Sequence, residues 1–300
     1  MEKNNHGRKT RDVFELITEG VIAQLKKGII PWRKTWTDTG IPRNLFTQRF
    51  YRGINLWLLS SAGYQQNYFL TFKQVKQLGG TVRKGEKGTP LIYWKKKEID
   101  SESLELAEKW FLQCYMVYNV AQCDGLTKKF ANVSYPINKI EECEKIVANM
   151  PLRPAIKFVE EDVHYHPLED TIYIPEAEKF DSDLEFYTAL FKNLIHSTGH
   201  ASRLARREII NDAEWGSQKY TIEQLTCELG ACYLLSHTGF NLPPGYEVGY
   251  LQTWLYYLRC DKKLLVNAGS QAQKAVDFIL NVPKVGVKQE LEVRNEGGKE

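Results

Sequence analysis

Residues 191–200 read Phe-Lys-Asn-Leu-Ile-His-Ser-Thr-Gly-His, and this stretch decides how the second half of the chain folds. Apolar side chains in and before it recur at helical spacing: Tyr187, Leu190, Phe191, Leu194 and Ile195. This pattern predicts a helix over 183–200 that packs one face into the core. Lys192, His196 and His200 follow at intervals of four residues, so they lie on one side of that helix.

The same stretch resembles a metal-binding helix that has lost part of its chemistry. In the His-Glu-x-x-His pattern of zinc peptidases, the two histidines hold zinc and the glutamate is the general base. Here His196 stands at the second histidine, Lys192 at the first and Asn193 at the base. An ammonium group repels a dication, and an amide cannot take a proton from water. The pattern therefore favours the fold of such a peptidase without its reaction.

A second helix, predicted over 220–237, carries the acids that belong to such a site. A third zinc ligand in these peptidases is an acid on a following helix. Gln224 and Glu228 stand at the i and i+4 positions that would provide this ligand and a supporting acid, and Glu223 is adjacent. We expect Lys192 to extend its ammonium toward the metal position and to pair with Glu228 or Glu223.

Two alternatives to this ion pair remain open. Lys192 reaches solvent while the pocket closes, or His196, His200 and Glu228 together hold a metal ion. Gly199 argues against the second alternative, because a glycine at this point can end the helix and turn His200 away. Asn193 would still leave no base beside a bound water.

The first third of the chain has a different character, because its charge is strongly positive. Residues 20–97 hold 15 Lys and Arg against two acids, whereas residues 98–300 hold 21 bases and 31 acids. Twelve aromatic residues are interleaved with the 15 bases. Cations that follow phosphates and rings that accept unstacked bases are what single-stranded nucleic acid requires. The candidate DNA-binding residues are Trp32, Arg33, Lys34, Trp36, Arg43, Arg49, Tyr51, Arg52, Asn55, Lys73, Arg83, Lys84 and Lys87.

Some aromatic residues of this segment lie in apolar patterns and are expected in the core instead, namely Trp57, Phe72, Tyr93 and Trp94. The helices expected outside the two described above are 11–27, 71–78, 138–149, 247–258 and 262–281. Strands are expected at 90–94, 110–120 and twice within 156–174, with a hairpin connection over 95–109. The fold class is therefore α+β, with two domains at 1–130 and 131–283 and a frayed tail at 284–300.

Composition excludes several other classes of protein. The chain has 43% hydrophobic and 26% charged residues, which is typical of a globular protein. No apolar run is long enough to span a bilayer, and the N-terminus lacks the apolar core of a secretion signal. We therefore expect a cytoplasmic protein without a membrane partner, whose six cysteines are reduced. No phosphate-binding loop is found, which argues against ATP use.

Motifs spread along most of the chain resemble the ArdC-type antirestriction family of plasmids and other mobile elements. They include Pro-Trp-Arg-Lys-x-Trp (31–36), Tyr-Arg-Gly-Ile-Asn (51–55), Leu-Gly-Gly-x-Val-Arg-Lys-Gly-Glu-Lys-Gly (78–88), His-Ser-Thr-Gly-His-x-Ser-Arg-Leu (196–204) and Glu-Leu-Gly-Ala (228–231). The resemblance implies an N-terminal domain that binds single-stranded DNA without sequence preference, followed by a mostly helical zincin-like metallopeptidase domain with a short sheet.

In that family the zinc motif usually reads His-Glu-Leu-x-His-x-Thr-Gly-His, followed by Glu-Glu-Leu-x-x-Glu. On this chain the first ligand falls on Lys192, the base on Asn193 and the later acid on Gln224, while His196 and Glu228 are kept. Three departures in one site favour a relict pocket without catalytic residues.

The resemblance therefore predicts an antirestriction-type protein that coats incoming single-stranded DNA. Its second domain would be a scaffold for a host restriction protein or a conjugation protein. No cofactor is expected, and zinc is the lesser possibility. The alternatives are an active zinc peptidase tethered to DNA, and an accessory factor in plasmid DNA replication or transfer.

Overall fold

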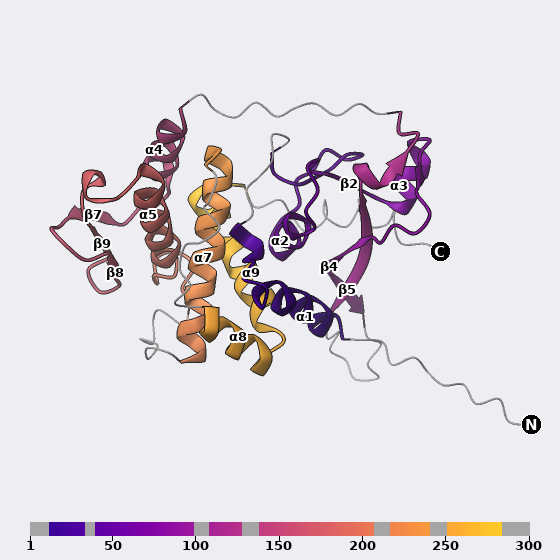
Figure 1. Ribbon diagram of the computed structural model, residues 1–300. Helices are drawn as coiled ribbons and strands as arrows, with labels where there is room; N and C mark the ends of the chain where they lie inside the picture. The colour runs from indigo at the N-terminus through magenta and orange to yellow at the C-terminus, as the bar shows by residue number, and fades with distance from the viewer. Residues whose placement is uncertain are drawn as a thin grey trace, which may run out of the picture.

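The structure is a computed structural model that describes residues 12–33, 40–98, 108–127, 138–206, 217–240 and 251–283. Within these ranges the side chains of Arg33, 96–98, 108–111 and Leu251 are not described. Figure 1 shows helices at the centre, one small sheet at the left and a larger sheet at the right. The predicted α+β class is confirmed.

The N-terminal half builds a four-stranded sheet with three helices beside it. Its elements are α1 (Val13–Leu25), η1 (Pro31–Arg33), β1 (Arg43–Asn44), α2 (Ile54–Ser61), β2 (Tyr68–Thr71), α3 (Phe72–Gln77), β3 (Thr81–Val82), β4 (Thr89–Glu98), β5 (Glu108–Asn119), η2 (Val120–Gln122) and β6 (Cys123–Asp124). The strand order is β1-β2-β5-β4, and β3 pairs separately with β6.

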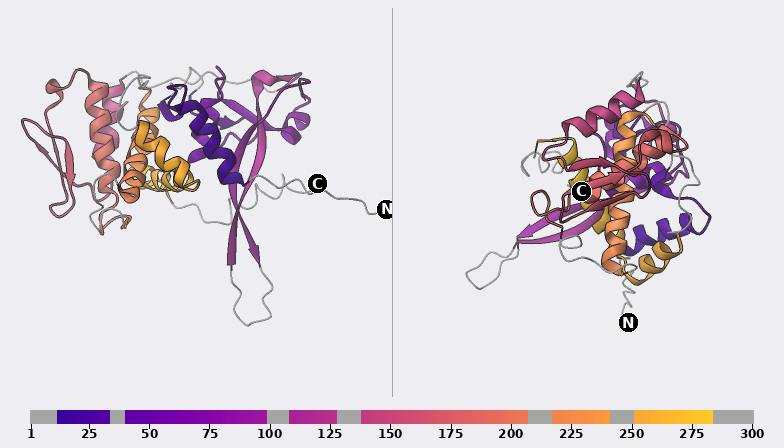
Figure 2. Two further views of the ribbon diagram at one scale, coloured as in Figure 1. Left: turned by 60° about the horizontal axis from the view of Figure 1, so that its bottom comes forward. Right: turned by 90° about the vertical axis from the view of Figure 1, so that its left-hand side faces the viewer.

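Local sequence signals set several of these boundaries. α3 begins at a capping box, because the Thr71 hydroxyl accepts from the backbone N–H of Gln74 while the Gln74 side chain accepts from the N–H of Thr71. Gly79, with a φ of 75°, follows the end of this helix. The expected connection over 95–109 is wrong at both ends, because β4 continues to Glu98 and β5 begins at Glu108. This hairpin projects from the body of the molecule (Figure 2).

The C-terminal half is mostly helical. Its elements are α4 (Lys139–Asn149), β7 (Ala155–Phe158), β8 (His164–His166), β9 (Thr171–Ile174), η3 (Ala177–Lys179), α5 (Asp183–Ser197), α7 (Gln218–Thr238), α8 (Leu251–Cys260) and α9 (Leu264–Ile279). Three strands form its sheet, in the order β7-β9-β8, where the sequence predicted two. The third strand was missed because β8 has only three residues. The predicted tail 284–300 and most of the predicted boundary 127–138 lie outside the described residues.

One hydrophobic core runs through both halves of the chain. Trp32 packs edge to face on Trp254 with ring centroids 5.4 Å apart, and Trp57 packs in the same way on Tyr233 at 5.2 Å. α2 approaches α9 closely at Gly269, where an added Cβ would lie 3.4 Å from Ile54. The division into domains at 1–130 and 131–283 stays a prediction.

Two expectations, about membrane-spanning segments and cysteines, can be compared with the described residues. None of the helices described is both long and apolar enough to cross a bilayer. All six cysteines are unpaired in the structure, and three of them are buried.

Candidate functional site

The relict pocket lies between α5 and α7, which approach each other closely. Gly230 of α7 permits this approach, because a Cβ at its position would lie 2.6 Å from Cδ1 of Ile195 on α5. Opposite charges meet across the two helices. The Lys192 Nζ lies 2.8 Å from the Glu228 Oε2, with 20% of the lysine side chain and 4% of the glutamate side chain exposed. The expected ion pair therefore forms, and the alternative in which Lys192 extends only into solvent is wrong.

The residue at the position of the general base does not face a reacting group. Asn193 is half-buried, and its Nδ2 donates to the carbonyl oxygen of Ala189, one turn earlier on the same helix, at 2.9 Å. Gln224, at the later acid position, is also half-buried. Neither side chain can act as a base.

A second buried ion pair lies near the C-terminal end of α5. Arg206 donates from Nε and Nη2 to the two oxygens of Glu223 at 2.9 and 2.7 Å, and both side chains are nearly inaccessible. The same guanidinium donates to Thr198 Oγ1 at 2.6 Å and to the carbonyl oxygen of Ile195 at 2.8 Å. Arg206 therefore satisfies carbonyl groups at the C-terminal end of α5 while it neutralises Glu223 on α7.

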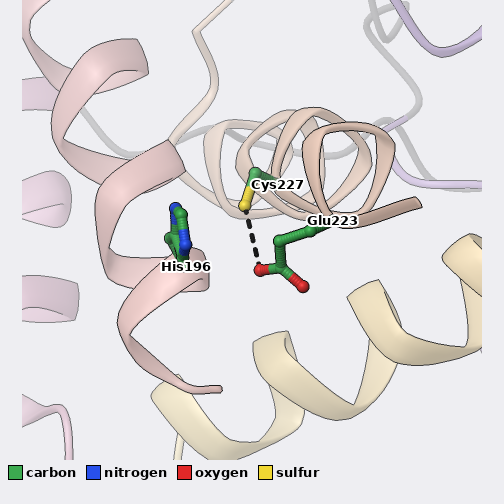
Figure 3. Close-up of side chains that lie close together, drawn as sticks. All are labelled: His196, Glu223 and Cys227. Atoms are coloured by element: carbon green, nitrogen blue, oxygen red, sulfur yellow. Dashed lines mark hydrogen bonds between the residues drawn. The ribbon is translucent and has the colours of Figure 1, made fainter. Parts of the chain in front are cut away.

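His196 of α5 lies close to Glu223 and Cys227 of α7 (Figure 3). Ligand atoms of these three side chains lie within 4.8 Å of one another, and the Cys227 thiol is 3.5 Å from Glu223 Oε1. Burial lowers the pKa of His196, with Glu223 opposing this effect and Arg206 adding to it. Burial and the neighbouring Glu223 raise the pKa of Cys227 well above its usual value. The histidine is thus neutral at pH 7 and the thiol keeps its proton.

This donor set does not fit the zinc centre of a peptidase. Such a centre has three protein ligands and an open position for water. Here both oxygens of Glu223 accept hydrogen bonds from Arg206, and Glu228 faces Lys192. Two fixed cations balance the two carboxylates, so a dication would have to enter beside two positive charges.

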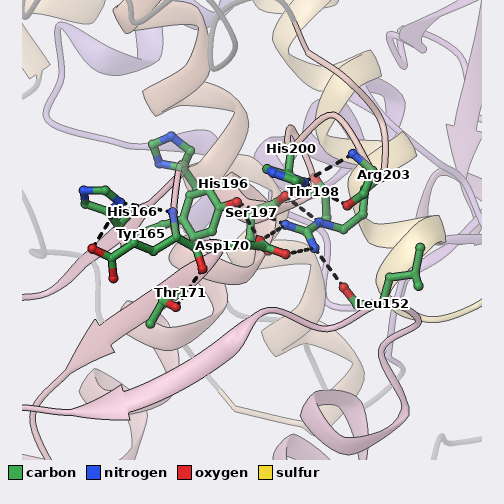
Figure 4. Close-up of polar contacts among 12 residues, drawn as sticks. Leu152, Tyr165, His166, Asp170, Thr171, His196, Ser197, Thr198, His200 and Arg203 are labelled. Atoms are coloured by element: carbon green, nitrogen blue, oxygen red, sulfur yellow. Dashed lines mark hydrogen bonds and ion pairs between the residues drawn. The ribbon is translucent and has the colours of Figure 1, made fainter.

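His200 does not join His196 as a second ligand of this cluster. α5 ends at Ser197, and His200 follows the Gly199 turn, where its Nδ1 accepts from the backbone N–H of Ser202 at 3.2 Å. Beside it, the Arg203 side chain is 1% exposed and ion-pairs with Asp170 (Figure 4). The alternative metal set of His196, His200 and Glu228 is not assembled.

The structure divides the candidate DNA-binding residues into three groups. Three exposed cations form no ion pair with an acid among the described residues, namely Arg49, Lys84 and Lys87. Lys73 is also exposed. Residues held by protein partners are Trp32, Arg43, Tyr51, Arg52, Asn55 and Arg83. Lys34, Trp36 and the side chain of Arg33 lie outside the described residues.

Two of these residues are held inside the protein, and their assignment to DNA binding stays a prediction. Trp32 is 1% exposed in the core, so its ring faces are covered. Asn55 donates to the carbonyl oxygen of Ile92 at 2.7 Å and accepts from its N–H at 2.8 Å, which ties α2 to β4. Arg52 is exposed and forms an ion pair with Asp277 of α9.

The aromatic residues expected in the core divide in a similar way. Trp57 is buried as predicted, and Tyr93 is half-buried. Phe72 and Trp94 are 49% and 40% exposed, so that expectation is wrong for both. Sequence reasoning also missed Arg206, because nothing in its local pattern distinguishes it from a surface arginine.

Comparisons with known proteins agree with this architecture. A model of the N-terminal domain of anti-restriction factor ArdC matches residues 11–118, and a zincin-like metallopeptidase model matches residues 141–271. The metal-free crystal structure of antirestriction protein ArdC from plasmid R388 is 30% identical, with a TM-score of 0.75, and the match covers 90% of this chain and 97% of that one. The chain belongs to the ArdC family of antirestriction proteins.

Further relatives extend the family. The Mn(II)-bound structure of the R388 ArdC protein matches with a TM-score of 0.74 at 30% identity, over 90% of this chain and 97% of that one. DNA primase TraC of Escherichia coli is 31% identical over 89% of the chain, which spans 27% of one such primase and 20% of another. The uncharacterized protein y4eC of Sinorhizobium fredii is 29% identical over 89% of this chain and 91% of its own length.

Proposed function

We propose that this ArdC-family protein binds single-stranded DNA without sequence preference and carries a metallopeptidase-like domain that has no peptidase activity. The observation that carries the second part is the 2.8 Å ion pair between Lys192 and Glu228. In this proposal the second domain is a scaffold that contacts a host restriction protein or a conjugation protein.

The loss of activity follows from the chemistry of three side chains. Lys192 puts an ammonium at the first ligand position, and Asn193 puts an amide at the base position. The remaining histidine, His196, faces a protonated thiol and a carboxylate already bound by Arg206. Peptide hydrolysis at such a site requires a nucleophilic water and a group that takes its proton. The amide of Asn193 at the base position cannot take this proton, which supports the proposal.

The DNA-binding part of the proposal depends on the excess of positive charge in residues 20–97. Within this segment Arg49, Lys84 and Lys87 are exposed and have no ion-pair partner among the described residues. Each phosphate neutralised by such a side chain releases counterions, which gives affinity without sequence preference. The family resemblance to an ArdC N-terminal domain supports the same assignment.

The proposal that the second domain lacks both a metal ion and peptidase activity is tested by elemental analysis and a peptidase assay on the full chain. The purified protein, dialysed without chelator, should hold far less than one equivalent of zinc or manganese. Casein digestion should not exceed that of a Lys192→Met variant. Stoichiometric metal with chelator-sensitive hydrolysis would instead establish an active peptidase.

DNA binding is tested with fluorescein-labelled oligo-dT over a salt series. Exchanging Arg49, Lys84 and Lys87 for alanine should reduce the slope of log affinity against log salt by about 2, since each lost phosphate contact on a single strand contributes about 0.7. A matched control exchanges three exposed lysines of the second half, Lys145, Lys219 and Lys274. Equal slopes for the two triple variants would contradict the assignment to the first domain.

A second candidate function is an accessory role in plasmid DNA replication or transfer. It is favoured by the 31% identity to DNA primase TraC, which the chain matches over only about a quarter of the primase's length. Co-purification with a plasmid primase or relaxase, dependent on single-stranded DNA, would support this role. Protection of incoming DNA from restriction in cells lacking such proteins would argue for the antirestriction role.

A further inference from the structure

An aromatic side chain stands exposed on the basic half of the molecule, where an apolar pattern predicted burial. Phe72 is the first residue of α3 and is 49% exposed. The helix beneath it is fixed by the capping box of Thr71 and Gln74, and Gln74 also accepts from Asn44 Nδ2 at 2.9 Å. The ring is therefore held on a rigid element rather than on a loose loop.

The ring of Phe72 belongs to a larger apolar surface on the four-stranded sheet. It packs edge to face on Tyr118 of β5, with ring centroids 6.3 Å apart. Met116, two residues earlier on β5, shares the face of Tyr118 and is 44% exposed. Gly88 lies against both, because a Cβ at its position would be 3.2 Å from Tyr118 and 3.3 Å from Met116. We name Phe72, Met116 and Tyr118 the ring platform.

One lysine lies against the ring platform, and two more lie on the turn that leads to it. The Lys76 Nζ lies 4.8 Å from the centroid of the Phe72 ring, within the range of a cation–π contact. Lys84 and Lys87 lie on the turn that leads to Gly88, and both are exposed. α3, β4 and β5 all belong to the right-hand part of the molecule in Figure 1, away from the relict pocket between α5 and α7.

The acids near this turn are already neutralised. Glu86 accepts from Arg83 Nη2 and from Gln122 Nε2, each at 3.0 Å. Asp124 ion-pairs with the same arginine at 3.3 Å. The three lysines 76, 84 and 87 have no acidic partner among the residues described, so their charge remains available to an anionic ligand.

We propose that the ring platform stacks an unpaired base of single-stranded DNA while Lys76, Lys84 and Lys87 contact its phosphates. An exposed ring beside cations that no acid neutralises fits this ligand better than an acidic or neutral protein surface, because stacking and phosphate contact are both provided. A base paired in a duplex cannot reach the ring without unstacking. This inference rests on the proposed function and specifies which surface performs it.

The test measures the affinity of the full chain for two probes, oligo-dT and an abasic oligonucleotide of equal length. Phe72→Ala should weaken binding of oligo-dT roughly 5- to 150-fold, which corresponds to the 1–3 kcal/mol of one stacked base. Binding of the abasic probe and the salt slope should not change, because no charge is removed. Phe72→Trp should retain the wild-type affinity.

The matched control is Phe158→Ala, because Phe158 is 58% exposed on β7 at the other end of the molecule. It should leave both probes unaffected. Circular dichroism spectra of all variants should match that of the wild type.

The outcomes separate this inference from the proposed function. If Phe72→Ala binds oligo-dT as tightly as the wild type does, the ring platform is wrong and the proposed single-strand binding stands. Equal weakening of both probes shows a merely structural residue, and also overturns it. If Phe72→Ala changes the oligomeric mass of the protein in solution but not its DNA affinity, the ring platform is a protein interface and the inference is wrong. Failure of the wild type to bind oligo-dT removes both proposals.

Discussion

Replacing Lys192 by methionine tests whether a fixed ammonium holds α5 and α7 together in place of a metal ion. The substitution keeps most of the length and apolar area of the side chain and removes only the charge. Glu228, whose side chain is 4% exposed, then loses the cation 2.8 Å away. We expect the free energy of unfolding to fall by about 3 kcal/mol.

The magnitude follows from the burial of the two partners. At an effective dielectric constant near 20, two unit charges 2.8 Å apart attract by about 6 kcal/mol, of which desolvation offsets a large part. Removing one member of a buried pair costs about 3–5 kcal/mol, since the other charge stays buried. Lys192 is 20% exposed, which places this pair at the lower end of the range.

The assay is urea unfolding followed by tryptophan fluorescence, with thermal melting as a second measurement. A loss of 3 kcal/mol corresponds to about 6–12 °C in the melting temperature. Lys145→Met is the matched control, because the Lys145 Nζ lies 2.9 Å from Glu142 on the surface, with 53% and 33% of the side chains exposed. Such an exposed pair contributes about 0–1 kcal/mol.

A double variant separates the ion pair from general packing. Lys192→Met with Glu228→Leu should recover at least half of the lost stability, because no unpaired charge remains. The reasoning is refuted if Lys192→Met costs no more than Lys145→Met, or if the two substitutions at 192 and 228 are simply additive. A wild-type melting temperature that rises with stoichiometric zinc would also refute it.

Three further predictions concern the same helix pair. Arg206→Met should cost about 3–5 kcal/mol in urea unfolding, because Glu223 stays buried without its cation, and a cost below 1 kcal/mol would contradict this. The pKa of His196 is lowered in the folded protein, so stability should fall as the pH drops below about 6.5 toward that lower pKa. His196→Gln should flatten this part of the stability curve, and an unchanged curve would exclude His196 as its source. Gly230→Ala should cost about 1–3 kcal/mol in thermal melts, since its Cβ would overlap Ile195, and wild-type stability would show that the helices can separate.

Much of the fold could be predicted from local patterns. The helical spacing of apolar residues located α5, and the helices expected over 220–237 and 71–78 correspond to α7 and α3. The departures of Lys192 and Asn193 from the zinc-peptidase motif could be recognised in the sequence, because a metal site requires particular residue types at a fixed spacing. Strand ends were less predictable, since the β4–β5 hairpin extends through a charged segment that period-two patterns do not mark.

The sequence by itself determined most helices of the second half, the positive charge of the first third and the residue types at the expected positions of the zinc ligand and base. Only the tertiary structure decided that Trp32 is buried while Phe72 is exposed, and that Arg206 reaches Glu223. The reason is that periodicity and capping act between residues a few positions apart. Burial and ion pairing depend on contacts between segments that are far apart in sequence. Trp32, for example, is covered by Trp254 of α8, and no local sequence pattern predicts this contact.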